Sequence, residues 1–163
     1  MAAVFSFPNP VNEKAARVVA GVVLVTVLVI LGTGAYWLLI PLTYGFWARV
    51  LTGPTLSPLG WTAQNVIAPR LGGKKPVPGP PKRFAQGMGA VMATAALVLG
   101  LILRHDTAAD VILGVFVIAA GLESIFAVCL GCQVFAALMR VGLIPASVCE
   151  ECADISRRLR ASA

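Results

Sequence analysis

Hydrophobic residues are concentrated in three long stretches of the chain, residues 15–51, 84–103 and about 107–143. A transmembrane α-helix needs roughly 20 consecutive apolar residues. The middle stretch therefore predicts one membrane-spanning helix over residues 84–104. The first and last stretches are longer than a single span, so each must be divided or must extend beyond the membrane.

The first stretch has a natural break at Gly-Thr-Gly, residues 32–34. Two glycines within three residues supply the tight turn that joins two antiparallel helices. This break predicts helices over about residues 10–31 and 35–51. Pro41 lies inside the second of these helices, and we expect it to kink that helix rather than end it.

Favourable helix starts precede the first span and the last span. Asn9 followed by Pro10 predicts an N-cap and a first helical residue. Thr107 is the corresponding N-cap candidate in the last stretch. That stretch predicts a membrane-spanning helix over residues 107–132, with a helical extension to about residue 143.

More polar segments connect and follow the apolar stretches. Residues 52–83 form a loop in which Ser57 begins a short amphipathic helix that ends near Ala68 and lies in the membrane interface. Residues 71–83 are basic and rich in Pro and Gly, so they predict neither helix nor strand. Residues 144–163 form a tail with a C-terminal helix. The expected fold is a single-domain, all-α integral membrane protein with four transmembrane helices arranged as two antiparallel hairpins.

Composition and charge support this prediction and orient it. Hydrophobic residues make up 58% of the 163 residues and charged residues only 12%, which is far from the composition of a soluble protein. Of the 13 Lys and Arg residues, Arg104 is the only one at the opposite end of the expected bundle. The positive-inside rule then predicts that both termini and the loop 52–83 are cytoplasmic. The net charge of +6 is explained by this orientation, so no nucleic-acid partner is expected.

All four cysteines lie in two CxxC pairs near the C-terminal end, Cys129 with Cys132 and Cys149 with Cys152. Two such pairs can form two redox couples, pass sulfur from one pair to the other, or bind one metal ion together. The separation of the pairs falls within the range of four-cysteine zinc sites. Because both pairs are expected on the reducing cytoplasmic side, we do not expect structural disulfides.

The two pairs differ in their expected surroundings. The first pair lies on the end of the fourth helix with both thiols on one face, where Gly131 permits close backbone approach or a local break. Cysteines in an apolar helix also occur as inert small hydrophobic residues. In the second pair, Ser147 and Glu150 predict a capping box for a helix that reaches about residue 159. Cys149 would then lie in the first turn, where the helix dipole favours a thiolate.

Four basic residues are candidates for contacting an anion or a partner next to the thiols: Arg49, Arg70, Lys82 and Arg83. Their ligand would be an oxyanion of sulfur or the acidic face of a partner protein. The alternative interpretation is that these charges orient the protein and contact lipid headgroups. The sequence pattern is compatible with both interpretations.

Glu123 is the one charged residue well inside an expected span, and such residues are functional candidates. It is either a proton carrier or quinone-site group, or an acid paired across the bundle with Gln86 or Thr94. Six residues separate Glu123 from Cys129, which corresponds to about 240° of rotation on a helix. We therefore do not expect Glu123 to share the face of the cysteines.

Several separated motifs resemble one known family. They are Phe-Pro-Asn-Pro-Val-Asn at residues 7–12, Ser-Pro at 57–58, Pro-Lys-Arg-Phe-Ala-Gln at 81–86 and Cys-x-Gly-Cys at 129–132. Together they resemble the bacterial membrane family catalogued as domain of unknown function 4395, over nearly the whole chain. That family has no settled activity. Its members are often encoded near thioredoxin-like proteins and thiosulfate sulfurtransferases, which implies thiol or sulfur chemistry at the bacterial cytoplasmic membrane.

These observations lead to one functional hypothesis and one alternative. The hypothesis is a thiol-redox or sulfur-relay protein of the cytoplasmic membrane, in which Cys149 and Cys152 exchange with a soluble thioredoxin-like or sulfurtransferase partner. Cys129 and Cys132 would pass electrons or sulfur at the membrane surface. The alternative is a non-enzymatic membrane anchor or accessory subunit whose four cysteines hold a structural zinc. A quinone cofactor is a weaker expectation, based on similarity to quinone-linked thiol oxidoreductases.

Overall fold

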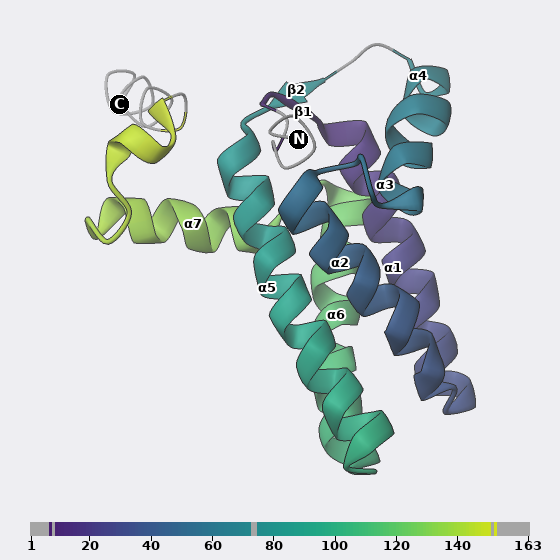
Figure 1. Cartoon of the computed structure of the whole chain (residues 1–163). Helices are drawn as coiled ribbons and strands as arrows, with labels where there is room; N and C mark the ends of the chain where they lie inside the picture. Colours follow the sequence, from purple (N-terminus) through teal and green to yellow (C-terminus); the bar gives the residue numbers. More distant parts are fainter. Residues whose placement is uncertain (1–6, 8, 73–74, 151, 153–163) are drawn as a thin grey trace.

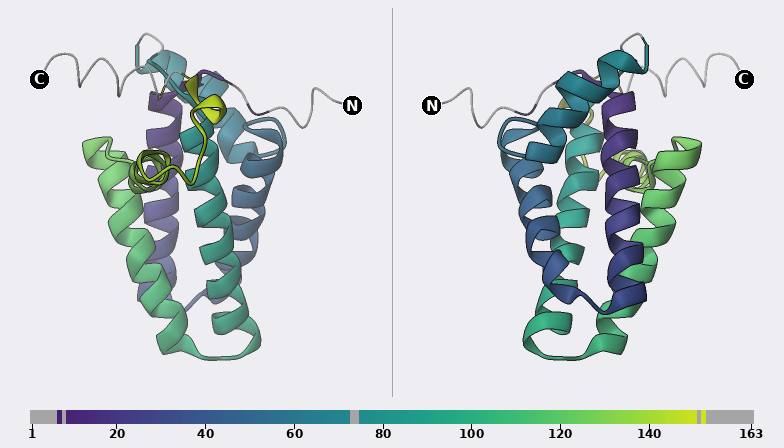
Figure 2. Two further views of the ribbon diagram at one scale, coloured as in Figure 1. Left: turned by 90° about the vertical axis from the view of Figure 1, so that its left-hand side faces the viewer. Right: turned by 90° about the vertical axis from the view of Figure 1, so that its right-hand side faces the viewer.

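The computed structural model describes residues 7, 9–72, 75–150 and 152 of the chain. Four helices lie side by side and form the body of the molecule, as Figure 1 and the two views of Figure 2 show. They are α1 (Glu13–Thr33), α2 (Leu39–Thr52), α5 (Gly79–Leu97) and α6 (Asp106–Phe126). Helix α1 packs mainly against α6, and α2 packs mainly against α5. The chain reverses twice at the lower end of Figure 1, between α1 and α2 and between α5 and α6.

Three helices are long and apolar enough to cross a membrane, namely Glu13–Thr33, Gly79–Ile102 and Asp106–Phe126. The second of these is α5 together with the π-helical turn Val98–Ile102 that continues it. Helix α2 has only 14 residues and follows a 3₁₀ turn at Tyr36–Leu38. The all-α class and the apolar, membrane-type helices are therefore confirmed, whereas α2 is shorter than the other three.

The outer faces of the bundle are apolar. Large aliphatic side chains on three helices are more than half exposed: Val25, Val91, Val111 and Ile118. So many exposed large apolar side chains are unusual for a soluble monomer and are normally covered by lipid or by another protein. The surface therefore agrees with association of the bundle with a bilayer.

Small residues on α5 allow the helices to approach closely. The fully buried alanines of this face are Ala90, Ala93 and Ala96. Gly89 on α5 lies directly against the ring of Phe46 from α2. That ring also packs against Phe116 of α6, with 5.5 Å between the ring centroids. Because helices in lipid associate through close packing of small residues, this face joins α2 and α6 to α5.

Helix α1 begins at Glu13, so the expected start at Asn9 and Pro10 is wrong. The N-cap is Asn12, whose side-chain oxygen accepts a hydrogen bond from the backbone N–H of Lys14 at 3.1 Å. An Asn side chain at this position satisfies one of the free N–H groups of the first turn. The residue type of the cap was predicted correctly, but its position was not.

The residues before α1 form a short antiparallel ladder with the middle loop. Strand β1 (Val11–Asn12) pairs with β2 (Pro76–Val77), so the expectation that residues 71–83 contain no strand is wrong. Asn9 accepts a hydrogen bond from the backbone N–H of Gly79 at 2.9 Å, and it thereby joins the segment before α1 to the start of α5. Local composition did not predict this ladder, because strand pairing depends on a partner far away in the sequence.

Prolines lie in the first turns of α2 and α5. Helix α2 begins at Leu39, so Pro41 occupies its first turn instead of kinking its interior. Helix α5 begins at Gly79 rather than near residue 84, with Pro80 close to its start. A proline is tolerated there because the N–H groups of the first turn have no intrahelical partner in any case.

The short helix of the middle loop begins where the sequence predicts. Ser57 caps α3 (Pro58–Thr62) and accepts a hydrogen bond from the N–H of Gly60 at 3.1 Å. The helix continues through a π-helical turn (Ala63–Ile67) into α4 (Ala68–Arg70). The alanine that opens each of the last two segments is fully buried, and both segments contact α1.

Helix α6 ends at Phe126, and the expected continuous helix to residue 132, with an extension to 143, is wrong. Ala127 adopts the left-handed conformation with φ 58°, which is unfavourable for an alanine. Helix α7 (Leu130–Arg140) then projects sideways from the bundle instead of continuing along α6 (Figure 1). The direction of the chain therefore changes immediately before the first CxxC pair.

Contacts from two other helices hold this change of direction. Arg17 of α1 donates hydrogen bonds to the backbone carbonyls of Ser124 (3.0 and 3.1 Å) and Ile125 (3.0 Å), which are free acceptors at the end of α6. Gly131 at the start of α7 lies so close to Ala85 of α5 that a Cβ atom on Gly131 would be 2.6 Å from the Ala85 Cα. The expectation that Gly131 permits close backbone approach is confirmed.

The described part of the tail differs from the expected capping box. Ser147 lies inside a 3₁₀ turn, Ala146–Val148, and is not the N-cap of a helix. Cys149 follows this turn, and its Sγ accepts a hydrogen bond from the backbone N–H of Cys152 at 3.3 Å. The remainder of the predicted tail helix, to residue 159, lies outside the described residues.

Candidate thiol site

Each CxxC pair is closed by its own disulfide, Cys129–Cys132 and Cys149–Cys152. The Cα atoms of the two pairs are 5.2 Å and 5.3 Å apart, respectively. A disulfide across two intervening residues closes a very short loop and restricts the unfolded chain only slightly. Neither bond cross-links separate elements of the fold, so neither is a structural disulfide of the kind that a reducing compartment disfavours.

The first pair lies at the beginning of α7 rather than on one face of a continuous helix. Cys129 is the N-cap residue of α7, and its Sγ accepts a hydrogen bond from the backbone N–H of Cys132 at 3.3 Å. A thiolate at this position would receive the free N–H groups and the positive end of the helix dipole. The second pair repeats the same hydrogen bond from its last residue to the sulfur of its first residue.

Glu123 forms an ion pair with Lys82 of α5. Both side chains are nearly buried, with 11% of Lys82 and 13% of Glu123 exposed. The expected partners of this acid are therefore wrong. Gln86 accepts a hydrogen bond from Arg49 at 2.8 Å, and Thr94 accepts one from the indole of Trp47 at 3.1 Å.

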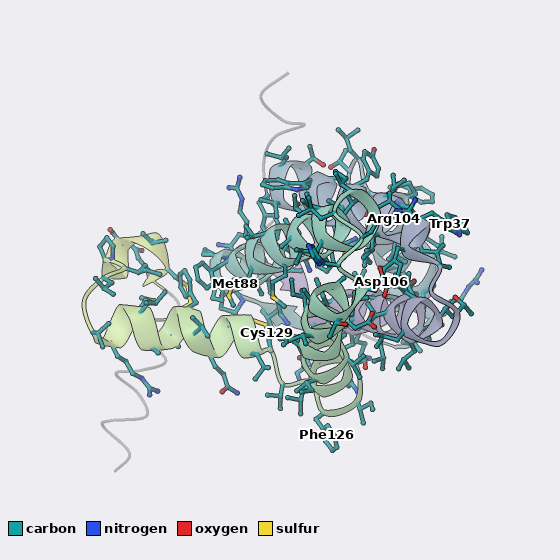
Figure 3. The ribbon with its side chains drawn as sticks, turned by 90° about the horizontal axis from the view of Figure 1, so that it is seen from below. Trp37, Met88, Arg104, Asp106, Phe126 and Cys129 are labelled. Atoms are coloured by element: carbon teal, nitrogen blue, oxygen red, sulfur yellow. A yellow bond between two sulfur atoms is a disulfide. The ribbon has the colours of Figure 1, made fainter. Side chains whose placement is uncertain are left out.

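A cavity of about 180 Å³ brings this ion pair and the first cysteine pair together. Cys129, Gly131, Lys82 and Glu123 all line it. Its other walls are largely apolar and include Val19, Phe46, Met88, Met92 and Phe116. Figure 3 shows Cys129 where α7 meets the bundle, close to Met88 of α5.

The expectation that Glu123 and Cys129 face different directions is wrong for a specific reason. The rotation of about 240° between Glu123 and Cys129 applies only if both lie on one continuous helix. Helix α6 instead ends at Phe126, with Ala127 as its C-cap. The turn there returns the first CxxC pair to the side of the bundle that carries Glu123 and Lys82. Glu123, which was expected on another face, and its partner Lys82 therefore share a cavity with Cys129.

A separate and larger cavity of about 460 Å³ reaches the residue before the second pair, but neither Cys149 nor Cys152 lines it. Its walls include Phe84 of α5, Phe135 of α7 and Val148, the residue before Cys149. The two phenylalanine rings pack against each other with 5.6 Å between their centroids, and this contact holds α7 against α5. Cys149 itself is only 5% exposed.

The four basic candidates do not form one cluster around the thiols. Lys82 pairs with Glu123, whereas Arg49 is buried between α2, α3 and α5. Arg83 is exposed and donates a hydrogen bond to the carbonyl of Val50 at 3.0 Å. Arg70 is exposed in the last turn of α4. Of the four, only Lys82 lines the cavity of Cys129.

The structure does not support the four-cysteine zinc site. Within the described residues, no group of three His, Cys, Asp or Glu side chains lies close enough to hold a metal ion. Cys129 and Val148, the residue before the second pair, line different cavities, with α7 between the two pairs in the chain. Sequence spacing alone could not exclude zinc, because the direction of α7 decides whether the pairs meet.

Two structural features of the site were not predicted. Arg17 fixes the end of α6 through carbonyls more than 100 positions away in the sequence, at Ser124 and Ile125. No local pattern around Arg17 indicates this long-range contact. Lys82 was predicted as an anion contact, and its pairing with Glu123 depends on the packing of α5 against α6.

The fold and the site define an all-α protein with membrane-type helices and a CxxC pair whose first cysteine lines a largely apolar cavity. The chain belongs to the family described as Domain of unknown function (DUF4395), whose model matches residues 11–140. This finding confirms the family resemblance in the sequence. The matched region includes the first cysteine pair and its cavity, and it ends before the second pair. No curated protein and no solved structure matches the chain.

Proposed function

We propose that the protein is a membrane thiol–disulfide exchange protein of the bacterial cytoplasmic membrane, with Cys129 and Cys132 as its exchange centre. The observation that carries this proposal is the shared cavity of Cys129, Lys82 and Glu123. Reactive cysteines typically lie in electropositive, partly exposed surroundings, next to a cation or at a helix N-terminus. Cys129 is partly exposed and caps α7, so the N–H groups at the start of this helix would favour a thiolate there, and it shares a cavity with Lys82, whose charge is balanced by Glu123.

The local hydrogen bonds indicate which sulfur leaves during exchange. The N–H of Cys132 donates to the Sγ of Cys129, so a negative charge on Cys129 is stabilised as the disulfide opens. An incoming thiolate of a partner therefore bonds to the Sγ of Cys132, and Cys129 departs as a thiolate. The same geometry in the second pair makes Cys152 the attacked sulfur and Cys149 the leaving group.

In the proposed reaction, a dithiol of the partner protein supplies both of the electrons that reduce the CxxC disulfide. The first thiolate of a partner dithiol forms a mixed disulfide with Cys132, and the bond between Cys129 and Cys132 breaks. The second partner thiolate then attacks its neighbouring sulfur in the mixed disulfide and releases Cys132. Two electrons pass from the partner, which becomes a disulfide, to the CxxC pair, which becomes a dithiol after Cys129 and Cys132 each take up a proton.

A soluble thioredoxin-like protein is the partner that this chemistry suits best, and it would meet the second pair first. Cys152 is partly exposed, whereas Cys149 is buried. The cavity beside Val148 provides an apolar surface with Arg83 at its edge. Capture of a thiosulfate sulfurtransferase instead would favour the transfer of sulfur over the transfer of electrons through the same cysteines.

The proposal predicts an asymmetric result in thiol trapping. In a Cys149→Ser variant whose Cys152 has first been converted to its mixed disulfide with thionitrobenzoate, the single thiolate of a purified thioredoxin whose resolving cysteine is replaced by serine should displace thionitrobenzoate and accumulate as a mixed disulfide with Cys152; the matched variant below is treated in the same way. The matched Cys152→Ser variant should trap much less, because the remaining thiol of Cys149 is only 5% exposed. Non-reducing gels after rapid alkylation measure both products.

Two results would contradict thiol exchange. One is the absence of mixed disulfide in both variants while the wild-type disulfides remain intact. The other is protection of all four thiols by tightly bound zinc in protein purified without chelators, which would instead support the anchor with a structural metal. Metal analysis of the same preparation separates these two results.

We also propose that α2 completes a set of four membrane spans. Its outer face carries exposed aromatic residues, Trp37 just before the helix and Tyr44 and Trp47 within it. Aromatic side chains of this kind are typical of lipid interfaces. The proposed orientation places the basic end of the bundle, with β1, β2, α3, α4 and α7, on the cytoplasmic side.

This orientation predicts opposite labelling at the two ends of the bundle. In a variant whose four cysteines are changed to serine, His105→Cys should react with a membrane-impermeant maleimide in intact spheroplasts. Leu71→Cys should react only after lysis, because it lies at the basic end. Both positions are exposed, so burial does not explain a difference. Equal labelling of both cysteines in intact spheroplasts would exclude the proposed topology.

A further inference from the structure

Arg49 is a buried cation with an incomplete set of partners. Only 5% of this residue is exposed. Its Nε donates to the Gln86 side-chain oxygen at 2.8 Å, its Nη1 lies 3.4 Å from the Ser57 hydroxyl, and its guanidinium carbon lies 4.6 Å from the centre of the Phe46 ring. Its Nη2 is buried and has no hydrogen-bond partner among the described residues. A buried charged donor without an acceptor is costly.

The charge of Arg49 also lacks a carboxylate. The ion pairs found in the described part of the chain join Lys75 to Glu13 and Lys82 to Glu123. Both nearby acids are therefore engaged with lysines, and neither pairs with Arg49. The neutral partners Gln86 and Ser57 accept hydrogen bonds but supply no negative charge. An uncompensated buried guanidinium is the kind of group that an anionic ligand would neutralise.

A cavity of about 60 Å³ lies next to this guanidinium. Arg49, Gln64, Lys82 and Gln86 provide the polar part of its lining. Gln86 uses its side-chain oxygen to accept from Arg49, so its amide N–H₂ group remains as a donor. The volume is roughly four times the ~15 Å³ that one water molecule requires, which is enough for a small polyatomic ion.

We propose that this cavity binds a small tetrahedral oxyanion, with Arg49 as its main ligand. Phosphate, sulfate and thiosulfate share this chemistry, and so does the phosphate of a lipid headgroup. A guanidinium is well suited to it because its planar set of donors matches the oxygens of such anions. The site shares Lys82 and Gln86 with the thiol cavity, so a bound anion would lie next to the exchange centre.

Anion binding is testable without any thiol reaction. The wild-type protein, purified in a neutral detergent, is titrated with sodium thiosulfate, sulfate or phosphate at constant ionic strength while its unfolding temperature is recorded. We expect a saturable increase for at least one of these anions. In Arg49→Gln, the apparent affinity should fall by about 10-fold or more, as expected for the loss of a charged hydrogen bond.

Arg70→Gln is the matched control, because Arg70 is exposed in the last turn of α4 and lies outside the cavity lining. It should bind the anion as the wild type does. If Arg49→Gln fails to fold, Gln64→Leu tests the same cavity from another wall and should also weaken binding. An equal loss in the Arg70 variant, or binding that neither cavity variant changes, would overturn the proposal.

Lipid nanodiscs distinguish the source of the anion. If the ligand is a headgroup phosphate, nanodiscs containing phosphatidylglycerol should raise the unfolding temperature of the wild type more than that of Arg49→Gln, and added free anion should then have little further effect. If the ligand is a free anion, its effect should persist in phosphatidylcholine nanodiscs. The anion site would be refuted if no free anion raised the unfolding temperature in a saturable way and if phosphatidylglycerol raised it equally in the wild type and in Arg49→Gln. That result would leave thiol trapping, which is measured separately, unaffected.

Discussion

Lys82→Ala should strongly destabilise the protein, because it leaves Glu123 without its partner inside the bundle. Both side chains of this pair are nearly buried. Removing one member of a buried ion pair typically costs about 3–5 kcal/mol, since an uncompensated charge remains. In a chain of this size, about 3 kcal/mol corresponds to a decrease of roughly 6 °C or more in Tm. Thermal unfolding of the purified protein in one detergent and at one scan rate measures this decrease.

Two comparisons separate the ion pair from the loss of a long side chain. Lys75→Ala removes a lysine that also pairs with a glutamate, Glu13, but whose own side chain is 67% exposed. Exposed pairs contribute about 0–1 kcal/mol, so this control should be nearly neutral. The double variant Lys82→Met with Glu123→Leu should recover most of the stability lost in Lys82→Ala, because it removes both charges of the pair and leaves neither one unpaired. An equal effect of the two single lysine variants would contradict a structural role for the buried pair.

The sequence correctly predicted two helix ends that depend on a local capping residue or glycine. Gly34 adopts the left-handed conformation with φ 67° and ends α1 by donating a hydrogen bond to Ile30. Ser57 caps the short helix of the middle loop as expected. Both signals are local, because a glycine or a capping serine acts on residues within one turn. Such features can be predicted from a single sequence.

The end of α6 could not be predicted in this way. Ala127 belongs to the residue type with the highest helix propensity, and it lies in an apolar run without glycine or proline. The structure ends the helix there because Arg17 provides donors for the carbonyls at the end of α6, and because α7 packs onto α5 at Gly131. Tertiary contacts overrule local propensity at this point, and these contacts are invisible in the local pattern.

The candidate site shows the same difference between features set by local sequence and features set by tertiary contacts. The CxxC motifs identified all four cysteines, because that pattern is contained in four residues. The neighbours of Cys129 were predicted incorrectly, because the cavity depends on the direction of the chain after Ala127. On a continuous helix Glu123 and Cys129 would face different directions. The turn after α6 brings both of them to one cavity. The motifs therefore identified the cysteines of this site, and packing determined their surroundings.

Gly131→Ala should detach the start of α7 from the bundle, because no space exists for the additional methyl group. A Cβ atom at this position would lie 2.5 Å from the Cβ and 2.6 Å from the Cα of Ala85. The obstacle includes backbone, so a side-chain rotation cannot relieve it, and overpacking of this kind typically costs about 1–3 kcal/mol. We expect a lower Tm and weaker trapping at Cys132 in a Cys129→Ser background, since the exchange centre would move away from Lys82.

Gly114→Ala is the matched control, because a Cβ atom on Gly114 of α6 meets nothing within 4 Å. It should be neutral or stabilise the helix by up to about 1 kcal/mol, as alanine is the better helix former. The propensity gain would also apply to Gly131, so a decrease in stability there must come from the contact with Ala85. Ala85→Gly in the Gly131→Ala background should restore part of the stability, since it removes the closer of the two obstacles. If Gly131→Ala is as stable as Gly114→Ala, then α7 does not rest on α5 through these two residues, and the cavity that joins Cys129 to Glu123 must be held in another way.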